Sequence, residues 1–180
     1  MKQELLNWVM LAHSEGNTRD AVRRFDRKTP YWLHPIGMAA LLIQDEALPW
    51  EFRLLAAEIA LLHDVREDTN FPLINAKPYI LSDFDLVEEG VNLLTGETSW
   101  KLWLHFLEDP KALPDHVFVV KMADLCDNMS TPGALKDPSF YQKVFPAVEK
   151  ELSERPALKG SIWPHRLRMV QDLLREKGLF

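Results

Sequence analysis

Residues 51–68 read EFRLLAAEIALLHDVRED, and this stretch decides the fold class. From Leu54 to Leu62 the side chains are apolar on almost every side of a helix, with Glu58 as the exception. A helix on the protein surface would show one polar face, so the pattern predicts a buried central helix that begins near Pro49. His63 and Asp64 follow the apolar run directly, and a polar pair at the end of a buried helix needs an explanation.

The other apolar segments also have helical spacing, and the alternation typical of strands is hard to find. Pro35 suits the first turn of a helix, and Ser82 is a suitable N-cap for another. The basic segment 19–32 is expected to form a loop. We expect helices, besides the central one, over residues 3–13, 35–44, 82–95, 99–107, 114–129, 138–152 and 162–177. The sequence therefore predicts one all-α domain of seven or eight helices over residues 1–180.

Length, charge and cysteine content exclude several classes of protein. A chain of 180 residues suffices for one domain with a proper core. Its formal charge of −6 does not fit a generic duplex binder, which carries a basic face, so no nucleic-acid partner is expected. The single cysteine, Cys126, excludes an intramolecular disulfide and a paired-cysteine zinc motif, which favours a cytoplasmic protein. Since no segment approaches the roughly 20 apolar residues of a membrane span, no membrane partner is expected either.

The pair His63-Asp64 has two interpretations. Imidazole nitrogen and carboxylate oxygen together suit Mn²⁺, Fe²⁺, Zn²⁺ or Co²⁺, and both side chains can converge on an ion beyond the helix end. The alternative is a capping histidine beside a solvated aspartate. Glu67 and Asp68 lie four residues after His63 and Asp64, so a continuing helix would put each carboxylate one turn beyond a candidate ligand. There they could orient and deprotonate a water molecule, or simply form a polar helix end.

A second polar pattern crosses the apolar helix expected over residues 114–129. Lys121, Asp124 and Asn128 form a stripe at spacings of three and four residues. Burying such a stripe is costly unless each group has a partner. A metal ion would satisfy Asp124, a phosphate would satisfy Lys121, and a ribose or phosphate oxygen would suit Asn128. The alternative is that this face is exposed to solvent.

Three motifs in this order resemble the HD-domain superfamily of metal-dependent phosphohydrolases. They are YWLHP (31–35) followed by Met38-Ala39, then ALLHDVREDT (60–69), then KMADLCDNM (121–129). The combination is most similar to the hydrolase domain of RelA/SpoT-type alarmone enzymes, particularly the stand-alone small alarmone hydrolases. The resemblance covers about residues 5–130, whereas residues 138–177 match only loosely.

The resemblance implies a role for each matching residue. His34, His63, Asp64 and Asp124 would bind one divalent metal ion, expected to be Mn²⁺, with Zn²⁺, Fe²⁺, Co²⁺ and Mg²⁺ as alternatives. Glu67 and Asp68 would activate the attacking water. The substrate would be a small nucleotide, (p)ppGpp, and the reaction would remove its 3′-pyrophosphate.

The substrate-binding segment departs from the family pattern, because Ala12-His13 is present but the Gly-Gln pair that commonly follows is not. Arg24 and Lys28 are the candidate phosphate contacts in this segment. Tyr31 could stack on a purine. The departure leaves open a hydrolase of another nucleotide (a 5′-nucleotidase, triphosphatase or phosphodiesterase), and an HD module that binds a nucleotide without turnover. The oligomeric state is not indicated by the sequence.

Overall fold

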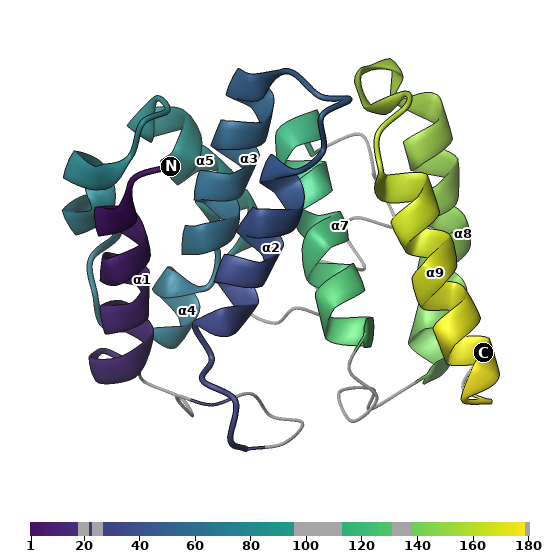
Figure 1. Ribbon diagram of the computed structural model, residues 1–180, viewed down its shortest axis with the longest axis horizontal. Helices are drawn as coiled ribbons and strands as arrows, with labels where there is room; N and C mark the ends of the chain where they lie inside the picture. The colour runs from purple at the N-terminus through teal and green to yellow at the C-terminus, as the bar shows by residue number, and fades with distance from the viewer. Residues whose placement is uncertain (18–21, 23–26, 96–112, 131–137, 179–180) are drawn as a thin grey trace.

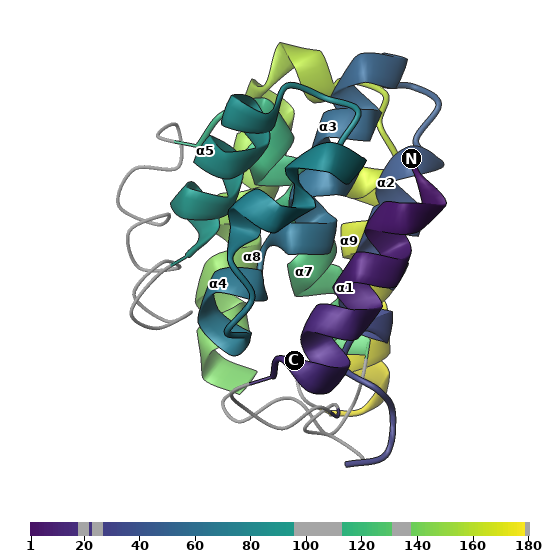
Figure 2. The same ribbon diagram turned by 90° about the vertical axis from the view of Figure 1, so that its left-hand side faces the viewer.

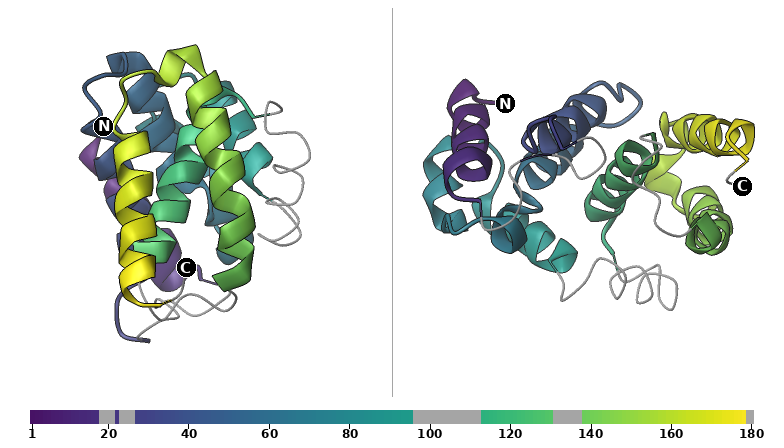
Figure 3. Two further views of the ribbon diagram at one scale, coloured as in Figure 1. Left: turned by 90° about the vertical axis from the view of Figure 1, so that its right-hand side faces the viewer. Right: turned by 90° about the horizontal axis from the view of Figure 1, so that it is seen from below.

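Three helices form the centre of the computed structural model, which describes residues 1–17, 22, 27–95, 113–130 and 138–178. Helix α3 (Trp50–Leu62) packs against α2 (Leu33–Ile43) and α7 (Asp115–Ser130), and these two also contact each other. Helix α1 lies on one flank and the pair α8 and α9 on the other (Figures 1 and 3). The remaining elements are α1 (Gln3–Glu15), α4 (Val65–Asp68), η1 (Leu73–Tyr79), α5 (Phe84–Leu94), α8 (Pro138–Glu154), η3 (Pro156–Leu158) and α9 (Trp163–Glu176).

Helix α3 is buried as its sequence predicts: every side chain from Ala56 to Leu62 is buried. Its exception, Glu58, is fully buried as well. The carboxylate accepts hydrogen bonds from the backbone N–H groups of Leu81 (2.8 Å) and Ser82 (2.9 Å). A buried carboxylate is tolerated where such donors satisfy it. Glu58 thereby fixes the segment that leads into α5.

The central helix stops at His63 instead of running on to Asp68. The peptide turns at His63 and Asp64, and the single-turn helix α4 begins at Val65. The backbone N–H of Asp68 donates to the carbonyl oxygen of Asp64 at 2.8 Å, which starts this new turn. The continuing helix that would stack Glu67 over His63 is therefore not formed. The interruption instead turns the His63 and Asp64 side chains out of the helix end.

The end of α1 lies close to the segment after α4. The backbone N–H of Asn70 donates to the carbonyl oxygen of Gly16 at 2.8 Å, and Asn17 forms an isolated bridge with Thr69. A Cβ atom on Gly16 would lie 2.2 Å from the Phe71 ring, so glycine permits this approach. Helix α4 lies at the level of the lower half of α1 (Figures 1 and 2), and the two helices are in contact. This contact holds the end of α1 beside the residues that follow Asp64.

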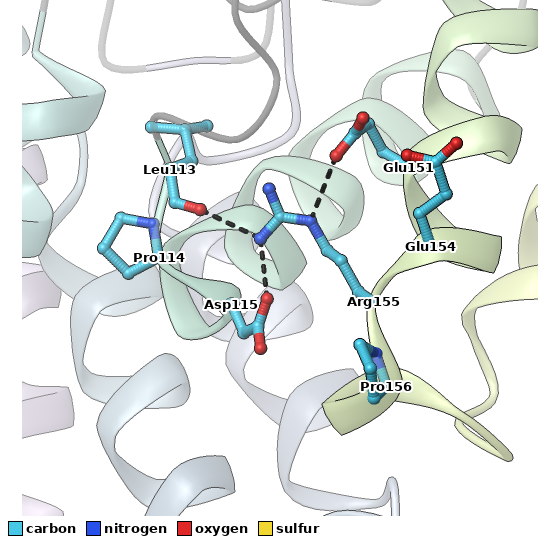
Figure 4. A pocket seen from close by; sticks show the side chains of 7 residues that line it. All are labelled: Leu113, Pro114, Asp115, Glu151, Glu154, Arg155 and Pro156. Atoms are coloured by element: carbon cyan, nitrogen blue, oxygen red, sulfur yellow. Dashed lines mark hydrogen bonds and ion pairs between the residues drawn. The ribbon is translucent and has the colours of Figure 1, made fainter.

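The C-terminal helices are joined to the centre by buried charged groups. The Arg155 guanidinium donates to the Leu113 carbonyl oxygen (2.9 Å) and the Asp115 carboxylate (2.7 Å), and lies 3.6 Å from Glu151 (Figure 4). It also lies over the Phe118 ring, 4.3 Å from the ring centroid. Buried Asp45, after α2, accepts from the Ile162 N–H just before α9. Helix α9 packs against α7, and α8 packs against α9.

The all-α prediction is confirmed: the described ranges hold helices and two isolated bridges, without a strand. The expected helix 99–107 lies outside the described residues. The cap of α5 was predicted wrongly, because Asp83 and not Ser82 is the N-cap and accepts from the Asp85 N–H. Ser82 instead gives its own N–H to Glu58. Across the described part of the chain, none of the helices has the length and apolar character to cross a membrane.

Candidate metal centre

Two buried imidazoles from different helices face each other at the site. His34 is in the first turn of α2 and His63 ends α3, and their ring centroids lie 5.4 Å apart. Nδ1 of His63 lies 2.7 Å from the Ala60 carbonyl oxygen, and Nδ1 of His34 lies 2.6 Å from Oδ2 of Asp127. Both oxygens accept a hydrogen bond, so each Nδ1 carries the proton. Each Nε2 is then the nitrogen that offers a lone pair to a cation.

The carboxylate of Asp64 joins the two imidazoles. Its Oδ2 lies 2.9 Å from Nε2 of His63 and 4.0 Å from Nε2 of His34. The Tyr31 hydroxyl donates to the same oxygen. Burial and the Asp64 carboxylate both raise the pKa of the Tyr31 phenol, so the hydroxyl keeps its proton and remains a donor. The break between α3 and α4 thus directs Asp64 toward His34 and His63.

Helix α7 supplies the third side of the site. Oδ1 of Asp124 lies 3.3 Å from Nε2 of His34 and accepts from the Asn128 amide at 2.5 Å, while Oδ2 pairs with the Lys121 ammonium at 2.7 Å. Lys121 and Asp124 are buried and Asn128 is half-buried. The solvent-exposed alternative for this stripe is therefore wrong. Lys121 and Asn128 both contact Asp124, so the residues of the stripe are partners of one another on a largely buried helix.

The electrostatics of the cluster favour a positive charge at its centre. Burial would lower the pKa of His63, but the Asp64 and Asp124 carboxylates and the Ala60 carbonyl together outweigh burial and raise this pKa to about 9. The pKa values of Asp64 and Asp124 fall below the ordinary range despite burial, chiefly through His63 for Asp64 and Lys121 for Asp124. The carboxylates are thus ionised, and the imidazoles attract a proton in the position where a metal cation would bind.

The donor set fits a divalent metal ion. His34, His63 and Asp124 each offer one ligand atom, and these three atoms lie within 4.8 Å of one another. Oδ2 of Asp64 is near Nε2 of both imidazoles. Mixed imidazole and carboxylate donors suit Mn²⁺, Fe²⁺, Co²⁺ and Zn²⁺. The four residues predicted as ligands are therefore close together in the structure, although they lie on α2, on α7 and at the junction of α3 and α4.

The other predicted site residues differ in position. Glu67 and Asp68 are on α4, directly after the Asp64 turn, with Glu67 half-buried and Asp68 buried. Tyr31 lies at the cluster, with its ring between those of His13 and His34. Lys28 is exposed in the segment before Tyr31, and Arg24 lies outside the described residues.

Two residues near the ligands were not predicted as part of the site. Asp127 holds Nδ1 of His34, and its sequence signal was its position three residues after Asp124 on one helix face. His13 is fully buried in the last turn of α1, 5.2 Å from the Tyr31 ring between centroids. Its signals were the Ala12-His13 pair of the resemblance and the apolar face of α1, formed by Leu5, Val9 and Ala12, which His13 continues. Asp127 supports a candidate ligand directly, whereas His13 packs behind Tyr31.

Comparison with known proteins places the fold. No protein-family model and no curated protein matches the sequence. Several solved structures match, and one of them matches over 98% of this chain and 95% of its own, with a TM-score of 0.62 and 20% sequence identity. It is a metazoan ortholog of SpoT that hydrolyses ppGpp and plays a role in starvation responses. This chain therefore shares its all-α fold, over almost its full length, with that SpoT ortholog.

Proposed function

We propose that this chain is a metal-dependent phosphohydrolase that removes the 3′-pyrophosphate from (p)ppGpp, giving GDP or GTP and pyrophosphate. The observation that carries the proposal is the convergence of buried His34 and His63 with the less buried Asp64 and Asp124 into one cluster. Support comes from the fold, which this chain has in common with a ppGpp hydrolase. Support also comes from the order of the three motifs, which matches that of alarmone hydrolases.

The four clustered residues would bind one divalent ion, with Mn²⁺ as our first choice. Such an ion, when bound, lowers the pKa of a water molecule and offsets negative charge at the attacked phosphorus. Water would attack the phosphorus that is bonded to the 3′ oxygen, so that the new P–O bond forms in the pyrophosphate product and the 3′ oxygen is the leaving group. Glu67 or Asp68 would take the proton from the attacking water, because both carboxylates follow the Asp64 turn on α4. The 3′ oxygen gains a proton and becomes the ribose hydroxyl.

Substrate contacts are proposed for five residues, of which Tyr31, Lys121 and Asn128 lie at this cluster. Lys121 pairs with Asp124, but an ammonium has three donors and can also contact a phosphate oxygen. Asn128 adjoins Asp124 from the other side, within reach of a ribose or phosphate oxygen. Tyr31, whose hydroxyl contacts Asp64, would use its ring to stack on the purine base. Arg24 and Lys28, in the basic segment before Tyr31, would bind phosphates electrostatically.

The direct test is incubation of the purified protein with ppGpp and Mn²⁺. We expect GDP and pyrophosphate in equal amounts, and no release from the Asp64→Ala variant. Asp172→Asn is a matched control, because this exposed residue on α9 pairs with Arg175 and touches no residue of the cluster. Absence of turnover by the wild-type protein, with metal bound, would exclude the alarmone assignment.

A related enzyme acting on another nucleotide is the second candidate, favoured by the missing Gly-Gln pair after His13. A panel of nucleoside mono- and triphosphates and nucleotide diesters separates the two, because faster release from a simple nucleotide selects this candidate. A binding module without turnover would show nucleotide affinity that is unchanged by His63→Ala and no bound metal.

A further inference from the structure

We propose that Asp127 is a positioning residue of the metal centre, which fixes the His34 imidazole so that Nε2 faces the other ligands. The inference rests on the proposed function, since it assigns a role toward the same metal ion. Oδ2 of Asp127 lies 2.6 Å from Nδ1 of His34, whose side chain is only 2% exposed. A carboxylate accepts hydrogen bonds and cannot donate them when ionised, so the proton of this contact belongs to Nδ1. Asp127 thereby selects the tautomer in which Nε2 can bind a cation.

Helix α7 contacts both nitrogens of this one imidazole. Asp124 lies 3.3 Å from Nε2 and Asp127 lies 2.6 Å from Nδ1, and the two aspartates are three residues apart on a shared helix face. The ring is therefore held at both ends by one rigid helix. A rotation of His34 about its χ angles would break the shorter of these contacts, so the contact limits the orientation of a candidate ligand.

The two imidazoles of the site have different supports. His63 gives its Nδ1 proton to a neutral backbone carbonyl, that of Ala60. His34 gives it to a carboxylate, which increases the basicity of the ring and its affinity for a cation more than a neutral acceptor does. Asp127 therefore contributes to metal affinity through its charge and through the orientation that it imposes.

The position of Asp127 explains how its charge is tolerated beside a buried histidine. Its side chain is 30% exposed, and it lines a cavity of about 410 Å³ between α2, α7 and α9, together with Cys126, Ser130 and Arg166. The carboxylate faces His34 with one oxygen and is accessible to solvent from the cavity. Partial solvation lowers the desolvation cost that a fully buried ion pair carries. Asp127 thus acts on His34 from behind the metal centre, with no need to touch substrate.

The test measures Mn²⁺ affinity directly, by titration calorimetry without nucleotide. Loss of such a supporting carboxylate weakens metal binding by about 10- to 100-fold. We expect this loss for Asp127→Ala and a smaller one for Asp127→Asn, whose amide oxygen still accepts from Nδ1 but carries no charge. Asp172→Asn is the control, because Asp172 lines the same cavity but pairs with Arg175 and not with His34. The Mn²⁺ affinity of this variant should equal that of the wild type.

Steady-state kinetics then separate positioning from a merely structural role. If Asp127 acts through metal affinity, saturating Mn²⁺ should restore most of kcat in Asp127→Ala, with KM for the nucleotide unchanged. If Asp127→Ala were inactive because it folds poorly, added Mn²⁺ would not restore kcat. Asp127→Asn has nearly the same shape as the wild-type side chain and therefore tests the role of the charge without a folding defect. Mn²⁺ affinities of both folded variants within twofold of the wild type would overturn the proposal. Unchanged Mn²⁺ affinity in the variants would contradict only the role of Asp127. A wild-type protein that binds Mn²⁺ but releases no pyrophosphate from ppGpp would contradict the proposed alarmone hydrolysis.

Discussion

Tyr31 donates its hydroxyl to Oδ2 of Asp64, the same oxygen that lies 2.9 Å from Nε2 of His63. One carboxylate oxygen is thus held from two directions, by a phenol before α2 and by an imidazole at the end of α3. Asp64 can keep this position because the helix breaks there and restarts at Val65. The arrangement fixes Asp64 between Tyr31 and His63 at the candidate metal centre.

Asp64→Ala is expected to abolish metal binding and hydrolysis together. The substitution removes a candidate ligand and also the carboxylate that raises the pKa of His63. Metal content by elemental analysis and pyrophosphate release should both fall to background. Retention of a stoichiometric ion by the folded variant would contradict the role of Asp64 as a ligand.

Tyr31→Phe tests whether this residue acts through its hydroxyl or through its ring. The variant keeps the ring for contact with a nucleotide base but removes the donor to Asp64. If the hydroxyl orients Asp64, we expect kcat to fall about 5- to 30-fold, as loss of one charge-assisted hydrogen bond of roughly 1–2 kcal/mol implies, with KM nearly unchanged. A raised KM with unchanged kcat would instead indicate a role in binding the nucleotide.

Glu67→Gln is expected to reduce turnover while the metal stays bound. The amide keeps the size of the side chain but cannot accept a proton from water, and general-base catalysis contributes roughly 10²- to 10⁴-fold. The kcat for pyrophosphate release should fall within this range while Mn²⁺ affinity is retained. Glu51→Gln, on the exposed first turn of α3, is the matched control and should be as active as the wild type.

Glu58→Ala is expected to destabilise the fold by roughly 2–4 kcal/mol. The fully buried carboxylate accepts from the N–H groups of Leu81 and Ser82, and both donors would lose their acceptor. Urea unfolding at neutral pH measures the free energy of unfolding. Glu58→Gln keeps one acceptor oxygen and should recover part of the loss. Equal stability of Glu58→Ala and the wild type would contradict this account of the buried charge.

His13 is expected to make folding stability depend on pH. Desolvation by burial lowers the pKa of His13 from 6.5 to about 4, and neither ring nitrogen has a hydrogen-bond partner in the described part of the chain. The unfolded chain therefore binds the proton more tightly, so the contribution of His13 is complete above pH 6.5 and declines as pH falls toward 4.

His13→Gln does not titrate, which isolates this effect. Between pH 7 and pH 5 the wild type should lose up to about 2 kcal/mol relative to the variant, since one pKa unit corresponds to about 1.4 kcal/mol. Urea unfolding of both proteins at each pH gives the difference, in which the titration of other groups cancels. Parallel curves for the two proteins would show that His13 keeps its ordinary pKa.

The sequence by itself determined the fold class and the buried central helix. A helix that is apolar on all sides can only be stable inside a core, and the run from Leu54 to Leu62 has that property whatever surrounds it. The sequence also contained the order of His34, His63, Asp64 and Asp124. The Ser82 cap was predicted wrongly because its neighbour Asp83 is an equally favourable N-cap, and its carboxylate accepts from the Asp85 N–H, so α5 begins one residue later. The acceptor for the Ser82 N–H, Glu58, is distant in sequence and lies close only after α3 and α5 pack.

Only the tertiary structure decided which groups meet. The turn at Asp64, the contact of Tyr31 with that carboxylate and the hold of Asp127 on His34 join residues from different helices. Periodicity reports which face of a helix is apolar, and this is a local property of the chain. The pairing of an imidazole with a carboxylate across α2 and α7 depends instead on how two helices pack, and that is determined by the whole core.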